Sequence, residues 1–194
     1  DAVETLASLA GVEVPRINTN NNSDSNNSNN ASSQYGNGNY NSNINIKKVY
    51  SCLEDANKLF SKNLNKTNKY AANAITYLQQ RGFTGVVAKE FSLGYAKDSW
   101  DNLMKNIKYS KEEMLQAGVV IKNDNNKIYD RFRDRIIFPI RDRRGRVIGF
   151  GGRIINEGTP KYLNSPETVA FNKSKELYGL FEIRHNLKDY SNIL

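Results

Sequence analysis

The sequence predicts an α+β protein in which several helices come first and a small antiparallel sheet follows. Two patterns lead to this prediction. Apolar residues recur at helical spacing between positions 49 and 117, and they alternate with period two between positions 136 and 155. The length of 194 residues allows one domain or two small ones, and no internal repeat is present.

The amino-terminal part of the chain differs sharply in composition from the rest. Residues 1–10 carry an amphipathic pattern that Gly11 ends, with Pro15 beyond it, which predicts a short helix. Between Asn18 and Asn45 there are 13 asparagines and 6 serines. Such a stretch cannot bury enough apolar surface to offset its ordering entropy. We therefore expect residues 16–46 to form an Asn/Ser-rich disordered linker.

Four helices are expected after this linker. Their apolar stripes and end signals place them at about residues 49–64, 71–81, 100–107 and 110–117. Asp98 or Ser99 can cap the third helix, and Ser110 with Glu113 has the spacing of a capping box for the fourth. Cys52 falls in an apolar stripe and is expected to be buried. Trp100 is assigned to a core or helix-anchoring role, although its ring could also stack on a base.

The second half of the chain is expected to form strands and one last helix. Short strands are predicted at 119–122 and 127–130, and a hairpin joins residues 136–140 to 148–150 through Asp142–Gly145. A final helix is expected from about residue 173 to 187. Strict alternation in the second hairpin strand predicts one face with Arg146, Ile148, Phe150, Gly152 and Ile154, and another with Val147, Gly149, Gly151, Arg153 and Ile155.

The glycines on that second face leave two interpretations open. Glycine within a strand often marks a bend or a packing accommodation. It also marks places where a ligand approaches the backbone closely, so Gly149 and Gly151 could form a shallow platform for a phosphate-bearing chain beside Arg153. The following loop, residues 158–168, supplies Lys161, Tyr162 and Asn164. A cation, an aromatic ring and an amide suit a single-stranded nucleic acid or a nucleotide, because every base has a π-face and every link a phosphate.

The overall charge favours an anionic partner. The formal net charge is +8, and residues 130–153 hold eight arginines against three aspartates. Nucleic acid and an anionic membrane surface are the two candidates, but no apolar run approaches the length of a membrane span. One cysteine and one histidine exclude an internal disulfide and a cysteine-based zinc site within this chain. We assign it no catalytic or metal-binding residue.

Residues 129–180 carry a long, nearly gapless resemblance to a known family. The run YDRFRDRIIFPIRDRRGRVIGFGGR, followed by TPKYLNSPET and ELYGL, resembles the amino-terminal, basic part of the RNA polymerase domain of bacterial DnaG-type DNA primases. Gln80–Phe83 and Leu93–Leu103 resemble the same family in the same order. The resemblance implies that residues 1–15 end a linker from a zinc-binding domain, and that residues 47–194 form the basic subdomain.

The resemblance also implies site residues. Arg81, Arg153, Lys161 and Lys173 match basic residues implicated in nucleotide or template binding, and a second rank comprises Arg131, Arg133, Tyr162 and Asn164. By spacing alone, Arg81 would only complement the dipole at a helix end. The family usually has histidine before the lysine that Lys173 matches, whereas this chain has Asn172, so any role of that histidine is not available here.

The function implied is synthesis of short RNA primers on single-stranded DNA from ribonucleoside triphosphates, in the cytoplasm. In the family, Mg²⁺ (or Mn²⁺) and Zn²⁺ bind segments that this chain does not contain, so we expect the fragment alone to bind template without polymerising. The replicative helicase and the single-strand-binding protein are expected partners through regions outside this chain. Two alternatives stay open: a non-catalytic single-stranded nucleic-acid-binding module of primase-like fold, and a basic scaffold for a protein partner.

Overall fold

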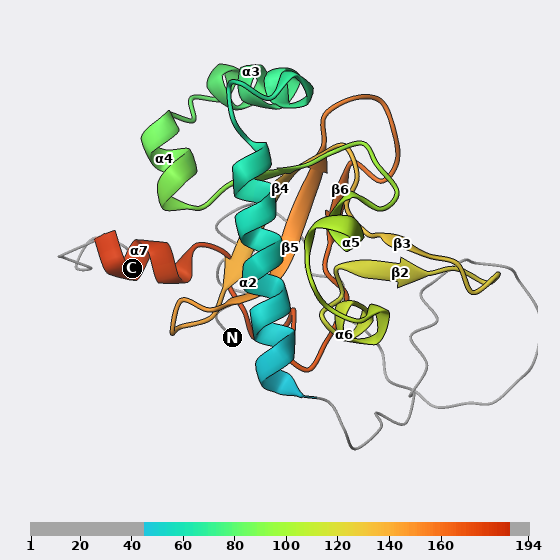
Figure 1. Cartoon of the computed structure of the whole chain (residues 1–194). Helices are drawn as coiled ribbons and strands as arrows, with labels where there is room; N and C mark the ends of the chain where they lie inside the picture. The colour runs from blue at the N-terminus through green and yellow to red at the C-terminus, as the bar shows by residue number, and fades with distance from the viewer. Residues whose placement is uncertain (1–44, 187–194) are drawn as a thin grey trace, which may run out of the picture. The chain divides into compact units, whose positions relative to one another are not determined.

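The computed structural model describes residues 45–186, and Figure 1 shows their arrangement. The predicted helix at residues 1–10 lies outside the described residues, as does the Asn/Ser-rich stretch up to residue 44. Within the described part, the α+β prediction is confirmed. The helices are α2 (Ile46–Asn63), α3 (Ala72–Gln80), α4 (Gly85–Glu90), α5 (Asn102–Asn106), α6 (Lys111–Gln116) and α7 (Leu180–Asn186), with a 3₁₀ turn at Lys69–Ala71.

The strands form two antiparallel sheets. The larger has the order β1-β4-β5-β6, from β1 (Gly94–Ala96), β4 (Arg135–Arg141), β5 (Val147–Ile154) and β6 (Tyr162–Asn164). The smaller pairs β2 (Val120–Lys122) with β3 (Ile128–Asp130). The predicted β4–β5 hairpin and the β2–β3 pair are therefore confirmed. Sequence patterns did not reveal β1, α4 or β6, which are all short. The pairing partner of β1 is β4, about 40 positions further along the chain.

Helix α2 covers one face of the larger sheet (Figure 1). Asn45 caps its first turn by accepting a hydrogen bond from the backbone N–H of Lys48. On its buried side, Phe60 meets the rings of Phe132 and Phe150 edge-on, with centroids 6.4 and 5.4 Å away. Cys52 is fully buried in this core, as predicted. Buried apolar residues from both halves of the chain thus form one core between helix and sheet.

Two predicted helix ends have different outcomes. The capping box of α6 is confirmed, because the Ser110 hydroxyl accepts from the backbone of Glu113 while the Glu113 carboxylate accepts from the backbone of Ser110. The predicted cap of α5 by Asp98 or Ser99 is wrong. Asp101 occupies the N-cap position without a capping bond, and the carboxylate of Asp130 accepts from the first turn instead.

Strict alternation along β5 is also wrong at its start. The pairing register shifts between Ile140 and Arg141, where β4 faces a bulge in β5. As a result Val147 packs in the same core cluster as Phe150, whereas Ile148 packs with Ile140 and Phe171. The bulge thereby reverses the predicted faces of Val147 and Ile148.

The segment after β5 is more ordered than predicted at one end and less helical at the other. The expected loop 158–168 contains strand β6, which pairs with β5. The expected helix 173–187 begins only at Leu180 within the described residues. The Asn172 carboxamide accepts hydrogen bonds from the backbone and hydroxyl of Ser174, which stabilises a turn in place of a helical start. Gly179 then has φ +80°, a left-handed conformation that separates this turn from α7.

Between residues 45 and 186, no helix combines the length and apolar character needed to cross a membrane.

Candidate nucleic-acid interface

Arg153 is the centre of a cluster of rings and cations at one end of the larger sheet. Its guanidinium lies 4.0 Å from the ring centroid of Tyr77 on α3 and 5.8 Å from that of Tyr162 on β6. Arg81, which caps the carboxyl end of α3, also lies near Tyr77: its guanidinium is 5.5 Å from the centroid of the same ring. The structure therefore brings Arg81 and Arg153 to one tyrosine, although 72 positions separate them in the chain.

Tyr162 is the exposed member of this cluster. Its side chain is 65% exposed. A hydrogen bond from Arg153 holds the pKa of Tyr162 below its ordinary value, and the charges of Lys161 and Arg81 add to this effect. A ring that faces solvent in a cationic setting can stack on a base while the neighbouring cations meet its phosphates.

Lys161 is presented to solvent by a loop that a buried arginine holds. Arg135 is 5% exposed, and its guanidinium donates to the backbone carbonyls of Pro160 at 2.8 Å, Lys161 at 3.4 Å and Gly152 at 3.4 Å. Burial is the main cause that lowers the pKa of Arg135. This planar fork joins β5 to the loop before β6, so it sets where Lys161 emerges.

A groove of about 360 Å³ continues from Tyr162 across the face of the sheet. Asn164 and Lys173 lie on its wall, so three of the predicted site residues share it. The remaining lining residues are Phe138, Ile140, Gly151, Gly152, Phe171, Glu176 and Tyr178. A mostly apolar floor with an amide and a cation at the wall is a typical setting for a planar ligand.

The two glycines of the expected platform behave differently. At Gly149, a Cβ would lie 3.2 Å from both Phe171 and Ser165, and the residue is buried, so the packing interpretation holds there. At Gly151, which lines the groove, a Cβ would lie 3.3 Å from the Asn164 side-chain oxygen. The platform interpretation therefore survives only at Gly151.

Arg131 and Arg133 lie outside the Arg153 cluster. Arg131 donates twice to the backbone carbonyl of Asn164, at 2.8 and 3.2 Å, and so fastens β6. Arg133 lies over the Trp100 ring at 4.2 Å and over Tyr129 at 5.0 Å. Trp100 itself is 61% exposed and precedes α5, so the predicted core or helix-anchoring role is wrong. These rings and Arg133 form a second aromatic–arginine surface, in which Trp100 is exposed and Tyr129 and Arg133 are half-buried, here called the Trp100 stack.

Much of the positive charge in residues 130–153 serves internal contacts. Six of its eight arginines donate to protein acceptors or ion-pair with a carboxylate: Arg131, Arg133, Arg135, Arg141, Arg146 and Arg153. Arg143 and Arg144 are exposed at the hairpin turn. The number of arginines in the sequence therefore overstates the cationic surface available to a ligand.

Sequence reasoning missed three residues of this surface. Tyr77 was assigned no role, Arg135 was counted only as charge, and Tyr178 was placed in a helix. A tyrosine four residues before Arg81 on the same helix face is a signal that could have identified Tyr77. Nothing in the local sequence distinguishes Arg135 from its neighbours. Within residues 45–186, no group of three or more His, Cys, Asp or Glu side chains is arranged to hold a metal ion.

Comparison with known proteins identifies the fold. The model of the DNA primase catalytic core, N-terminal domain, matches residues 59–184. Among solved structures, a DnaG primase catalytic domain bound to single-stranded DNA is 41% identical with a TM-score of 0.68, over 72% of this chain and 46% of that one. A DNA primase domain from Pseudomonas aeruginosa is 47% identical with a TM-score of 0.68, over 73% and 45%. The fold is that of a primase catalytic-core domain.

The chain belongs to the DNA primase family, which the resemblance in the sequence had implied. A DNA primase of Pseudomonas aeruginosa is 41% identical over 197 aligned residues, which cover 100% of this chain and 27% of that protein. The DNA primase of Legionella pneumophila is 46% identical over 75% of this chain and 25% of its own length. The chain thus spans about a quarter of the curated relatives that it matches.

Proposed function

We propose that this chain supplies the template- and nucleotide-binding surface of a DNA primase that makes short RNA primers on single-stranded DNA. One observation carries the proposal: Arg153 stacks between Tyr77 and Tyr162, beside Arg81 and Lys161. Rings with adjacent cations bind bases and phosphates together without reading sequence. Single-stranded DNA bound to a solved relative of the same fold supports this assignment.

The groove and the Trp100 stack extend the proposed surface. Lys173 and Asn164 would contact the sugar–phosphate chain or a nucleotide in the groove, with Gly151 admitting it close to the backbone. Trp100 and Arg133 offer a second place for a base to stack. Arg131 contributes by holding β6, since its guanidinium is engaged with the backbone of Asn164.

The reaction of the whole protein would be nucleotidyl transfer, in which a 3′-hydroxyl attacks the α-phosphorus of a ribonucleoside triphosphate and pyrophosphate leaves. Residues of this chain would orient the template and neutralise phosphate charge, which are positioning and electrostatic contributions. Mg²⁺ or Mn²⁺, and Zn²⁺, would bind outside residues 45–186. Residues 1–15, 16–46 and 47–194 would be the end of a linker from a zinc-binding domain, an Asn/Ser-rich linker and the basic subdomain. We place the protein in the cytoplasm, with a replicative helicase and a single-strand-binding protein as partners.

Binding of fluorescent oligo(dT) across a salt series tests the proposal. About four phosphate contacts give a log–log slope of about −3, because each contact on a single strand contributes roughly −0.7. Removing two contacts with Arg153→Ala/Lys161→Ala should make the slope about 1.4 less negative. The matched control is Arg143→Ala/Arg144→Ala, which removes the same charge from the exposed hairpin turn.

The outcomes separate the competing functions. Equal losses in the two double variants would mean that only net charge matters, and would overturn the assigned surface. No binding by the wild-type chain would favour the protein-scaffold alternative. Primer synthesis by this chain alone on a single-stranded template, with Mg²⁺ and ribonucleoside triphosphates, would contradict the division of labour proposed for the whole enzyme.

A further inference from the structure

A buried aspartate sits directly behind the Trp100 stack. Asp130 is 3% exposed, and among the residues that the structure describes no lysine or arginine forms an ion pair with its carboxylate. Burying a carboxylate without a cation is costly unless its oxygens accept hydrogen bonds. Asp130 therefore needs backbone donors, and it finds them at the start of α5.

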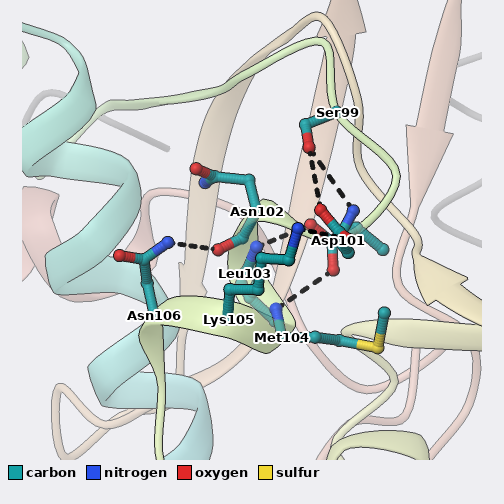
Figure 2. A network of polar contacts seen from close by, with 8 residues as sticks. Ser99, Asp101, Asn102, Leu103, Met104, Lys105 and Asn106 are labelled. Atoms are coloured by element: carbon teal, nitrogen blue, oxygen red, sulfur yellow. Dashed lines mark hydrogen bonds and ion pairs between the residues drawn. The ribbon is translucent and has the colours of Figure 1, made fainter.

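The carboxylate of Asp130 replaces the missing cap of α5. One oxygen accepts from the backbone N–H of Leu103 at 2.6 Å and the other from that of Met104 at 3.2 Å. Figure 2 shows this first turn. Asp101 does not cap it but exchanges hydrogen bonds with Ser99, accepting from the Ser99 hydroxyl and donating its backbone N–H to it. Asp101 also pairs with Lys105 at 2.8 Å. The cap thus comes from a residue that is distant in sequence.

The backbone of the same residue holds both partners of the stack. The N–H of Asp130 donates to the carbonyl of Trp100 at 2.8 Å. Its carbonyl accepts from the guanidinium of Arg133 at 2.5 Å. Side chain and backbone of Asp130 therefore fix the backbone of Trp100, the first turn of α5 that follows it, and the position of the cation over its ring.

We infer that Asp130 is a positioning residue, which holds Trp100 and Arg133 as an open stacking surface for one base of single-stranded DNA. The inference rests on the proposed function. Its physical basis is that the exposed Trp100 ring packs on Arg133 and, edge-on at 5.1 Å, on Tyr129. Without the cap of α5, the ring would lose its fixed direction, and ordering it on binding would oppose affinity.

The test is direct because Trp100 is the single tryptophan of the chain. Intrinsic fluorescence titrated with oligo(dT) therefore reports this surface. Asn at position 130 offers only one acceptor oxygen to two N–H groups. For Asp130→Asn we expect about tenfold weaker binding, within the range that one stacked base contributes, and loss of the fluorescence change. The salt slope should stay unchanged because no cation is removed.

A matched control separates positioning from general destabilisation. Ser110→Ala removes the capping box of α6 but leaves the Trp100 stack intact. It should lower stability while leaving the affinity and the fluorescence change as in the wild type. If circular dichroism shows that Asp130→Asn does not fold, Asp130→Glu takes its place, since it keeps both oxygens and displaces them by one methylene.

The results decide between this inference and the proposed function. Suppose that the wild-type chain binds oligo(dT) with a fluorescence change. A folded Asp130 variant with the same affinity and the same fluorescence change would then overturn the positioning role. Equal loss of affinity in Ser110→Ala would overturn it as well, because helix stability alone would then explain the effect. Wild-type chain that does not bind would instead overturn the proposed function.

Discussion

The charge-conserving substitution Arg135→Lys separates placement of the Lys161 loop from net charge. The Arg135 guanidinium makes one short hydrogen bond, to the carbonyl of Pro160 at 2.8 Å, and two longer ones at 3.4 Å. A lysine ammonium is a point charge that cannot span β5 and the loop together. The formal charge of the chain stays at +8.

The expected loss of stability follows from these contacts. A hydrogen bond from a charged donor contributes about 1.5–3 kcal/mol, and the longer pair contributes less. Lysine can retain one of the three, so we expect unfolding to become easier by about 2 kcal/mol. For a folded region of this size that corresponds to a fall of roughly 4–8 °C in Tm, measurable by circular dichroism.

The oligo(dT) binding assay tests whether Arg135→Lys also affects binding. If the loop shifts, Lys161 should lose one phosphate contact, and the salt slope for oligo(dT) should become about 0.7 less negative. Arg143→Lys at the exposed hairpin turn is the control and should change neither Tm nor slope. A lower Tm for Arg135→Lys with an unchanged slope would refute the reasoning, since Lys161 would then be placed without Arg135.

Three further predictions concern the scaffold. Gly94→Ala should lower the free energy of unfolding by about 2–3 kcal/mol, because the added Cβ would lie 2.5 Å from the Cβ of Phe60. Gly85→Ala is the control, since its added Cβ meets nothing within 4 Å and should not destabilise the fold. Thermal unfolding compares the two variants. Burial raises the pKa of Asp130 to about 6, so its protonated form is favoured by folding. The stability advantage of wild type over Asp130→Asn should therefore fall by roughly 2 kcal/mol between pH 4 and pH 7, and a flat difference would contradict this. Glu182→Ala should lower the free energy of unfolding by about 3 kcal/mol, because it removes the buried carboxylate that lies 3.2 Å from Nε of Arg141. Urea unfolding measures this change, and an unchanged free energy would show that the ion pair to α7 contributes little to stability.

Local signals in the sequence predicted the elements whose determinants lie within a few residues. The Ser110–Glu113 box, the stripe of α2 and the β4–β5 hairpin all belong to this group. Two features that were missed or misplaced depend on distant partners. β1 exists because it pairs with β4, and the cap of α5 comes from β3. Short-range patterns contain no information about such partners.

The same division applies to the candidate site. The sequence by itself determined the family, the basic character and which side chains to consider, because a long motif keeps its residue types in order. Only the tertiary structure decided which of these side chains meet. It joined Arg81 to Arg153 through Tyr77, and it assigned Arg131 and Arg135 to backbone carbonyls. The physical reason is that a guanidinium serves equally well as a surface charge or as an internal donor, and only the acceptors that folding brings within reach select between the two roles.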